Sequence, residues 1–144
     1  MEQAVVDLFR RYDDQTNIAL AGKPDMAAIG DLYEDAFIAA SPQGVMAGKK
    51  DEEFAKGIEA GFAHYREIGT QRMHVTHIKV EPIDALHALA RVEWRASYDT
   101  DSGQKTIDFT NAYLVRVVDG HATVFGWITG DENAELRKYG SARE

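Results

Sequence analysis

The stretch that decides the fold runs from Thr106 to Thr129 and reads TIDFTNAYLVRVV-DG-HATVFGWIT. It contains two strand-like runs that are joined only by Asp119-Gly120. A two-residue Asp-Gly link favours a type I′ turn, in which both residues adopt positive φ and the twist of the turn matches that of the strands. Such a turn fixes the facing residues. We predict an antiparallel hairpin whose pairing begins with Val118 opposite His121 and continues unbroken to the strand ends.

Both faces of this predicted hairpin are largely apolar. An antiparallel sheet with one face in water carries polar residues on that face, so we expect both faces to be covered. We assign one face to an internal pocket, with Leu114 opposite Phe125 and Ala112 opposite Trp127; it carries Thr110, Ala112, Leu114, Arg116, Phe125, Trp127 and Thr129.

The opposite face forms an apolar strip that no remaining helix of the chain covers: Tyr113, Val115, Val117, Val124 and Ile128. An apolar strip left in water promotes association, so we expect a homodimer that packs through this outer sheet face. A charge at Val115 or Val124 is expected to give a monomer or an insoluble protein. Upstream, Arg91, Glu93 and Arg95 alternate with apolar residues, which places these charges on the outer face near the dimer interface.

Length and composition limit the class of protein. The 144 residues suit one domain, 1–144, and a hydrophobic content of 44% is typical of a globular protein. A net charge of −8 argues against nucleic acid and anionic membranes as partners. The chain has no cysteine, no signal peptide and no apolar run of about 18 residues, so we expect a cytoplasmic location. The histidines lack metal-ligand spacing, and we predict neither a metal nor a cofactor.

Periodicity and turn residues predict an α+β order of elements. The stop glycines are Gly22 and Gly69, and Ser41-Pro42-Gln43-Gly44 is typical of a tight turn. We predict helices over 2–21, from Pro24 through Tyr33, and over 51–68; strands over 36–40, 45–47, 72–80, 86–98, 106–118 and 121–129; and a final helical turn within 131–139.

Several of these pieces together resemble the nuclear transport factor 2-like superfamily, also called SnoaL-like. The resemblance covers essentially the whole chain and matches an uncharacterised branch. Its pieces are Leu32-Tyr33-Glu34-Asp35-Ala36-Phe37 before the tight turn, Gly48 before the third helix, Met73-His74-Val75-Thr76 at a strand start, and Val117-Val118-Asp119-Gly120 through Trp127-Ile128-Thr129.

The resemblance implies a cone-shaped, cystatin-like α+β barrel. In it, three N-terminal helices pack on a strongly curved, mostly antiparallel sheet around an internal pocket, and dimers through the sheet are common. It does not imply one function, because the superfamily includes isomerases, dehydratases, epoxide hydrolases, polyketide cyclases and binding or assembly domains.

Two chemistries of the superfamily lack their residues here. The ketosteroid isomerases need a carboxylate base before the proline turn, where this chain has Ser41, and an acid on the hairpin, where the count from Asp119-Gly120 gives Ala112. The limonene epoxide hydrolases need paired carboxylates inside the cavity, and the pocket face of the hairpin predicted above carries none.

A dehydratase-type site is the remaining enzyme hypothesis. His74 matches a strand histidine of the scytalone dehydratases, and Asp13 is the helix carboxylate that could orient it. The alternative interpretation is an exposed aspartate on a helix flank and a histidine in the pocket wall.

Three functions therefore stay open. The first is binding of a small, mostly apolar organic acid, lactone or ring compound in the internal pocket. The second is a dehydratase- or cyclase-type enzyme with His74 as acid or base, and the third is a protein-interaction domain. The residues expected to line the pocket are Tyr12, Thr16, Tyr33, Ser41, His74, Trp94, Thr110, Phe125, Trp127 and Thr129.

Overall fold

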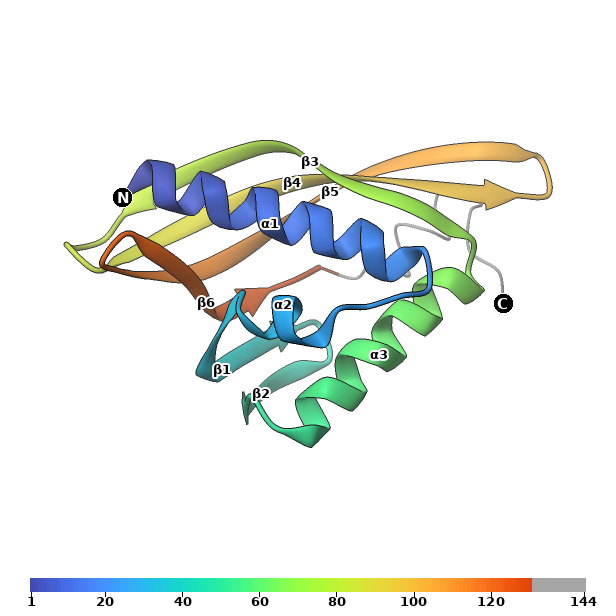
Figure 1. The fold of residues 1–144 in the computed structure, drawn as a ribbon. Helices are drawn as coiled ribbons and strands as arrows, with labels where there is room; N and C mark the ends of the chain where they lie inside the picture. The colour runs from blue at the N-terminus through green and yellow to red at the C-terminus, as the bar shows by residue number, and fades with distance from the viewer. Residues whose placement is uncertain (131–144) are drawn as a thin grey trace.

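A computed structural model describes residues 1–130 and has an α+β fold (Figure 1). The predicted turn within 131–139 lies outside the described residues. In chain order the elements are α1 (Glu2–Leu20), α2 (Met26–Gly30), β1 (Tyr33–Ser41), β2 (Gly44–Lys49), α3 (Glu52–Glu67), β3 (Thr70–Pro82), β4 (His87–Thr100), β5 (Gly103–Val118) and β6 (His121–Ile128).

All strands join one curved sheet in the order β2-β1-β6-β5-β4-β3. The sheet is mixed, because β1 runs parallel to β6 while the other neighbours are antiparallel. Helix α1 lies along one face of the long strands, and α3 follows the β1–β2 hairpin and lies beside it (Figure 1). The helices thus do not form one N-terminal block, since α3 is inserted between two strands.

The helix ends follow from local hydrogen bonds. Asp51 caps α3 by accepting a bond from the Phe54 N–H, 3.1 Å away, and acidic residues fill the first turn. Helix α2 is shorter than predicted, and the assignment of Tyr33 to it is wrong. The Leu32 N–H closes the helix on the Ile29 carbonyl, while the Leu32 carbonyl accepts a bond from Val124 of β6. Tyr33 therefore begins a strand.

The final turn has the predicted geometry. Asp119 and Gly120 have φ of 53° and 78°, as a type I′ turn requires. Pairing follows the predicted register from Val118–His121 to Val115–Val124, and then shifts. Leu114 pairs with Gly126, so Phe125 has no partner on β5 and forms a β-bulge. The predicted pairs Leu114–Phe125 and Ala112–Trp127 are therefore wrong.

The predicted assignment of the two faces is also wrong for most of this hairpin. The inner face, under α1, holds Tyr113, Val115, Val117 and Val124, each at most 8% exposed. Because side chains alternate along a strand, Thr110, Ala112, Leu114 and Arg116 lie on the outer face instead. The register of a hairpin determines which residues lie opposite each other, but it does not determine which of the two faces is buried. The bulge then returns Trp127 to the inner face and leaves Ile128 outside, 56% exposed.

The β4 charges lie where the sequence predicts. Arg95 on the outer face makes two hydrogen bonds with Asp108 of β5, at 2.8 and 3.1 Å. The inner face of β4 contributes Ala90, Val92, Trp94 and Ala96 to the core. Within residues 1–130, no helix combines the length and apolar character needed to cross a membrane.

Candidate functional site: an internal aromatic cavity

A cavity of about 330 Å³ lies between α1, α3 and the inner face of the sheet. Its wall is mostly aromatic and aliphatic, and none of the lining residues within 1–130 carries a charge. We call it the internal cavity; its lining consists of Tyr12, Gln15, Thr16, Ile29, Leu32, Tyr33, Gly57, Ile58, Gly61, Phe62, Tyr65, Met73, Trp94, Asn111, Tyr113, Trp127 and Thr129.

Hydrogen bonds hold the polar tips of the aromatic wall. The hydroxyl groups of Tyr12 and Tyr33 lie 2.6 Å apart. On the sheet side, the Trp94 Nε1–H donates to the Tyr113 hydroxyl at 3.0 Å, and the Asn111 Nδ2 donates to the same oxygen at 3.3 Å. Burial raises the pKa of the Tyr33 phenol above its ordinary value, against the smaller opposing effect of the Tyr12 bond. The phenol is therefore neutral at physiological pH.

Stacked rings fix Trp127 in the wall. Its ring lies 5.0 Å from that of Phe37, at an interplanar angle of 25°. The Phe37 ring in turn covers Gly48 of β2, where an added Cβ would lie 2.8 Å from it. A glycine is needed at this position because any side chain would displace Phe37 and with it the indole of Trp127.

Two side-chain oxygens of the wall have no hydrogen-bond partner. They are Asn111 Oδ1 and Gln15 Oε1. Asn111 is 6% exposed, so bulk water does not compensate this oxygen freely. A buried acceptor without a donor costs about 1–3 kcal/mol, so a donor brought within reach of either oxygen would be stabilising.

The mouth of the internal cavity lies beside α3. Gly57 and Gly61 line the cavity and are themselves exposed. A Cβ added at either glycine would meet no atom within 4 Å. Each glycine costs a helix interior roughly 0.5–1 kcal/mol relative to alanine, so this exposed pair keeps the mouth free of side chains at the expense of helix stability.

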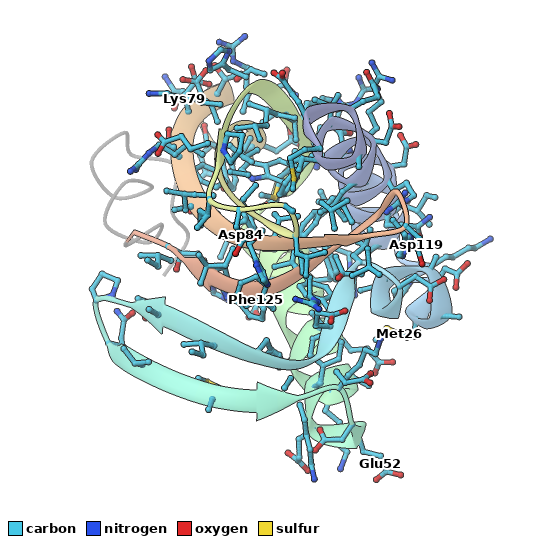
Figure 2. All side chains as sticks on the ribbon, turned by 90° about the vertical axis from the view of Figure 1, so that its left-hand side faces the viewer. Met26, Glu52, Lys79, Asp84, Asp119 and Phe125 are labelled. Atoms are coloured by element: carbon cyan, nitrogen blue, oxygen red, sulfur yellow. The ribbon has the colours of Figure 1, made fainter. Side chains whose placement is uncertain are left out.

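The structure brings together most of the residues predicted for the pocket. Tyr12, Thr16, Tyr33, Trp94, Trp127 and Thr129 all line the internal cavity. The other four do not. Ser41 is the last residue of β1, where it bonds to Gln43 of the turn, and Thr110 is exposed on the outer face. Phe125 also points outward, against the ring of His87, on the same side of the sheet as Asp84 (Figure 2).

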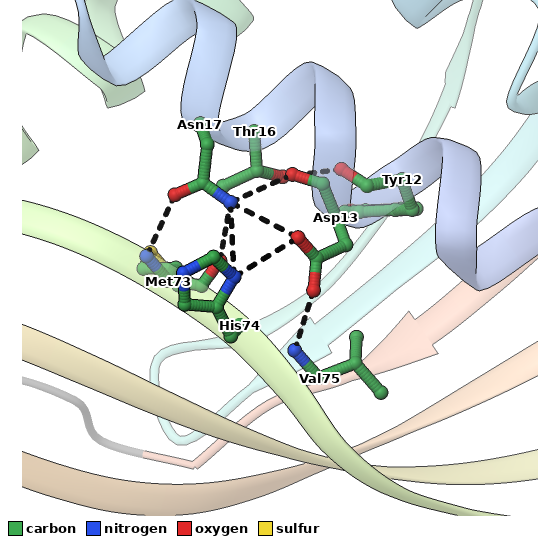
Figure 3. Close-up of polar contacts among 7 residues, drawn as sticks. All are labelled: Tyr12, Asp13, Thr16, Asn17, Met73, His74 and Val75. Carbon is green, nitrogen blue, oxygen red and sulfur yellow. Dashed lines mark hydrogen bonds and ion pairs between the residues drawn. The ribbon is translucent and has the colours of Figure 1, made fainter.

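His74, the fourth, lies outside the internal cavity although its predicted partner is present. Its Nδ1 is 3.2 Å from Asp13 Oδ1, but its side chain is 52% exposed (Figure 3). It lines a shallow surface groove with the cationic side chains of Arg66 and Arg72. His74 and Asp13 are therefore in contact as predicted, but His74 does not reach the internal cavity.

The side chains of Asp13 and Asn17, one helical turn apart on α1, bond to the backbone of β3 (Figure 3). Strand β3 is the last in the sheet, so one side of its backbone has no strand partner. Asp13 Oδ2 accepts a bond from the Val75 N–H at 2.8 Å. Asn17 accepts from the Met73 N–H at 3.0 Å and donates to the Met73 carbonyl at 2.8 Å. These side chains attach α1 to the sheet edge and occupy it.

Asn111 and Tyr113 are the main cavity residues that the sequence prediction missed. They belong to the face of β5 that was assigned to the dimer. One signal was available: a two-residue turn at Asp101-Ser102 pairs Trp94 with Phe109 and Val92 with Asn111. If Val92 and Trp94 point inward, then so do their partners on β5.

The only titratable groups among the described lining residues are phenols. No Asp, Glu, His, Lys or Arg of residues 1–130 lines the internal cavity, and Ala112, counted as the acid position, faces outward. Within residues 1–130, no cluster of three His or acidic side chains is arranged to hold a metal ion.

Solved structures with the same fold share little sequence with this chain. An NTF-2 like protein of unknown function from Shewanella oneidensis has a TM-score of 0.66 at 14% identity, covering 90% of this chain and 98% of its own. A domain of unknown function with a cystatin-like fold from Nostoc punctiforme has a TM-score of 0.67 at 17% identity, with 96% and 82% covered. An uncharacterised protein with a cystatin-like fold from Caulobacter vibrioides has 0.65 at 14%, with 96% and 94% covered.

At these identities the structural likeness shows the fold alone. No curated protein matches the sequence. The family model described as NTF2-like protein (DUF6841) matches residues 2–132, nearly the whole chain. With its curved mixed sheet and its helices, the chain belongs to this family of NTF2-like proteins.

Proposed function

We propose that the protein binds a small, uncharged, mostly apolar organic molecule in the internal cavity. The observation that carries this proposal is a cavity of about 330 Å³ with an aromatic wall and no charged side chain among its lining residues within 1–130. This volume is at the lower end of the range for ligand sites, which suits one or two rings. In this proposal the curved sheet and the helices form the cone-shaped enclosure that the resemblance implied.

Aromatic rings provide the attraction. Each ring that stacks on a ligand contributes its buried apolar area and the geometric preference of aromatic pairs, about 0.5–1.5 kcal/mol beyond area alone. Trp94 and Trp127 lie in the wall and are the only tryptophans of the chain. A charged ligand would lose its hydration without a counter-ion, at a cost of several kcal/mol.

A variant that fills the mouth tests the proposal. In Gly61→Leu, the new side chain enters open space beside the cavity, so α3 is expected to keep its structure while the cavity loses volume. Isothermal titration with 2-naphthol is expected to show binding to the wild type and at least tenfold weaker binding to Gly61→Leu. The matched control is Ala60→Leu, one residue away on the exposed side of α3.

Equal affinities of Gly61→Leu, Ala60→Leu and the wild type would contradict binding in the internal cavity. Absence of any binding by naphthalene, 2-naphthol and related ring compounds to the wild type would contradict the proposal as a whole. Both results are independent of which natural ligand the protein encounters.

The enzyme hypothesis gains no support from the site. It needs His74 beside a bound substrate, whereas His74 lies in a surface groove and Asp13 bonds to the backbone of β3. Turnover that survives in Gly61→Leu but not in His74→Ala would reverse this conclusion.

We also propose that two copies of the chain associate through the outer sheet face, with a set of residues that shares only Ile128 with the predicted strip. Paired positions on β1, β4, β5 and β6 bring Ile38, Leu89, Leu114 and Ile128 to this face, with Phe125 from the bulge beside them. Ile38 and Ile128 are 49% and 56% exposed, and an apolar patch of this kind favours association.

Sedimentation velocity tests the proposed dimer. The wild type is expected to sediment as a dimer and Ile128→Lys as a folded monomer. Ile18→Lys serves as the control, because Ile18 is 44% exposed on α1, which covers the opposite face of the sheet. A monomeric wild type would contradict the dimer.

A further inference from the structure

The polar side chains of the internal cavity narrow the class of ligand further than its apolar wall does. Asn111 Oδ1 and Gln15 Oε1 both lack a partner, and both are acceptors. They come from opposite sides, since Gln15 lies on α1 and Asn111 on β5. A molecule between the helix and the sheet would therefore have an unpartnered acceptor behind the wall on each side.

The Asn111 amide has its Nδ2 toward the Tyr113 hydroxyl and its Oδ1 without a partner among residues 1–130. The Trp94 indole can only donate, and it donates to the Tyr113 hydroxyl. The Asn111 Nδ2 donates to the same hydroxyl oxygen, which leaves Oδ1 as the free end of the amide. Trp94 and Tyr113, which are 2% and 3% exposed, hold Asn111 in place.

We infer that the internal cavity selects uncharged ring compounds that donate hydrogen bonds, such as phenols, enols and lactams, over esters, ethers and ionised acids. This inference rests on the proposed function and narrows its ligand class. A lactone or an ether has no hydrogen to offer Asn111 Oδ1, so its binding leaves that oxygen without a donor. A carboxylate would place a negative charge against these two acceptors, with no cation among the lining residues that the structure describes.

Four compounds that share one ring system separate these cases: 2-naphthol, 2-methoxynaphthalene, 2-naphthoate and naphthalene. Isothermal titration is expected to give about tenfold tighter binding of 2-naphthol than of 2-methoxynaphthalene, the size of one well-formed bond to a buried acceptor. The charged 2-naphthoate is expected to bind more weakly than naphthalene itself.

Two variants test whether the preference for 2-naphthol over 2-methoxynaphthalene depends on Asn111 Oδ1 and Gln15 Oε1. Asn111→Leu removes the buried oxygen while keeping a branched side chain, and the ratio of the two affinities is expected to fall toward one. Gln15→Met removes the other oxygen on a less buried residue of α1, so its effect can be read even if Asn111→Leu fails to fold. Circular dichroism checks the fold of each variant.

Thr70→Val is the matched control. Thr70 Oγ1 is the third buried side-chain oxygen without a partner among residues 1–130, but it lines the surface groove beside His74. Thr70→Val therefore removes a comparable oxygen elsewhere, and the ratio of affinities is expected to remain as in the wild type.

The outcomes separate this inference from the proposed function. If 2-methoxynaphthalene or 2-naphthoate binds as tightly as 2-naphthol, the inference is wrong, while weaker binding to Gly61→Leu still supports a ligand cavity. A ratio that persists in both Asn111→Leu and Gln15→Met also overturns the inference. If none of the four compounds binds the wild type, the proposed function fails and the inference fails with it.

Discussion

The hydroxyl oxygen of Tyr113 on β5 lies 3.0 Å from the indole nitrogen of Trp94 on β4, and both residues are almost fully buried. The bond joins two neighbouring strands at the wall of the internal cavity. The same oxygen also accepts a hydrogen bond from Asn111, so Tyr113 holds the Asn111 side chain in its place in the cavity wall. The geometry of the cavity therefore depends on a contact between residues of the sheet, not on a loop.

A double-mutant cycle measures this contact. Trp94→Phe and Tyr113→Phe each remove one partner, and urea unfolding is expected to give a coupling energy of about 0.5–1.5 kcal/mol between them. A cycle between Trp94→Phe and Phe125→Leu, which lie on opposite faces of the sheet, is the control. Strictly additive effects in the first cycle would contradict the described hydrogen bond.

The attachment of α1 to the sheet edge predicts unequal effects at Asp13 and His74. Asp13→Ala leaves the Val75 N–H without its acceptor and is expected to cost about 1–3 kcal/mol of unfolding free energy. His74→Ala is expected to change it by about 0.5 kcal/mol or less, since the side chain is half exposed.

Hydrogen exchange gives the local readout for the same pair. The Val75 amide is expected to lose protection in Asp13→Ala and to keep it in His74→Ala and Asp13→Asn, which retains one oxygen. Equal losses in Asp13→Ala and His74→Ala would show that the dyad, not the backbone contact, is the important interaction.

The inverted faces of the last hairpin predict opposite outcomes for adjacent residues. Val124→Asp buries an unpaired charge in the core and is expected to cost about 3–5 kcal/mol or to prevent folding. Phe125→Asp places the charge on the outer face and is expected to cost about 1 kcal/mol or less. Thermal unfolding of the two variants decides between the two assignments, because the sequence-based one predicts the reverse order.

The carboxylate of Asp84 predicts part of the stability in acid. Bonds from the Leu86 N–H first, and then from the His87 side chain and N–H, lower the pKa of Asp84 below its ordinary value of 3.8. A group with a lowered pKa stabilises the fold above its unfolded-state pKa, and this contribution is lost as the pH falls through the folded-state value.

Asp84→Asn should therefore be less stable than the wild type at neutral pH and should depend less on pH below about pH 4. Urea unfolding from pH 2 to 7 measures both, and the exposed helix residue Asp14, changed to Asn, is the control. If the unfolding free energy of Asp84→Asn fell as steeply below pH 4 as that of the wild type, the result would contradict the hydrogen bonds assigned to Asp84.

The element order could be predicted from the sequence because it depends on local signals. The Asp119-Gly120 turn and the stop at Gly69 each act within a few residues and lie where the sequence placed them, and α3 begins one residue after the predicted Asp51, which caps it. The faces of the sheet could not be derived from the last hairpin alone, since both of its faces are apolar. The charged residues of β4 show which face of β5 is exposed, because the turn at 101–102 fixes the pairing of these two strands. Arg95 on the outer face pairs with Asp108, so Asp108 and Thr110, two residues further along β5, also face outward.

The bulge at Phe125 is the part that no local pattern predicted. An extra residue in one strand changes the face of every residue beyond it, and here it brings Trp127 into the cavity wall despite the wrong face assignment. Gly126 accommodates the bulge, because a Cβ there would lie 3.0 Å from Leu114 Cδ1 and 3.3 Å from the Ile38 carbonyl. Such packing depends on β1, which is distant in sequence.

The occupancy of the internal cavity is tested most directly by the indole N–H signals of the protein in a ¹H–¹⁵N NMR spectrum. Trp94 and Trp127 give the only two such signals, and both residues line the cavity. Titration with 2-naphthol is expected to shift both signals in the wild type and in Ala60→Leu, and neither in Gly61→Leu. Unmoved indole signals in the wild type, or equal shifts in Gly61→Leu, would contradict an internal ligand site.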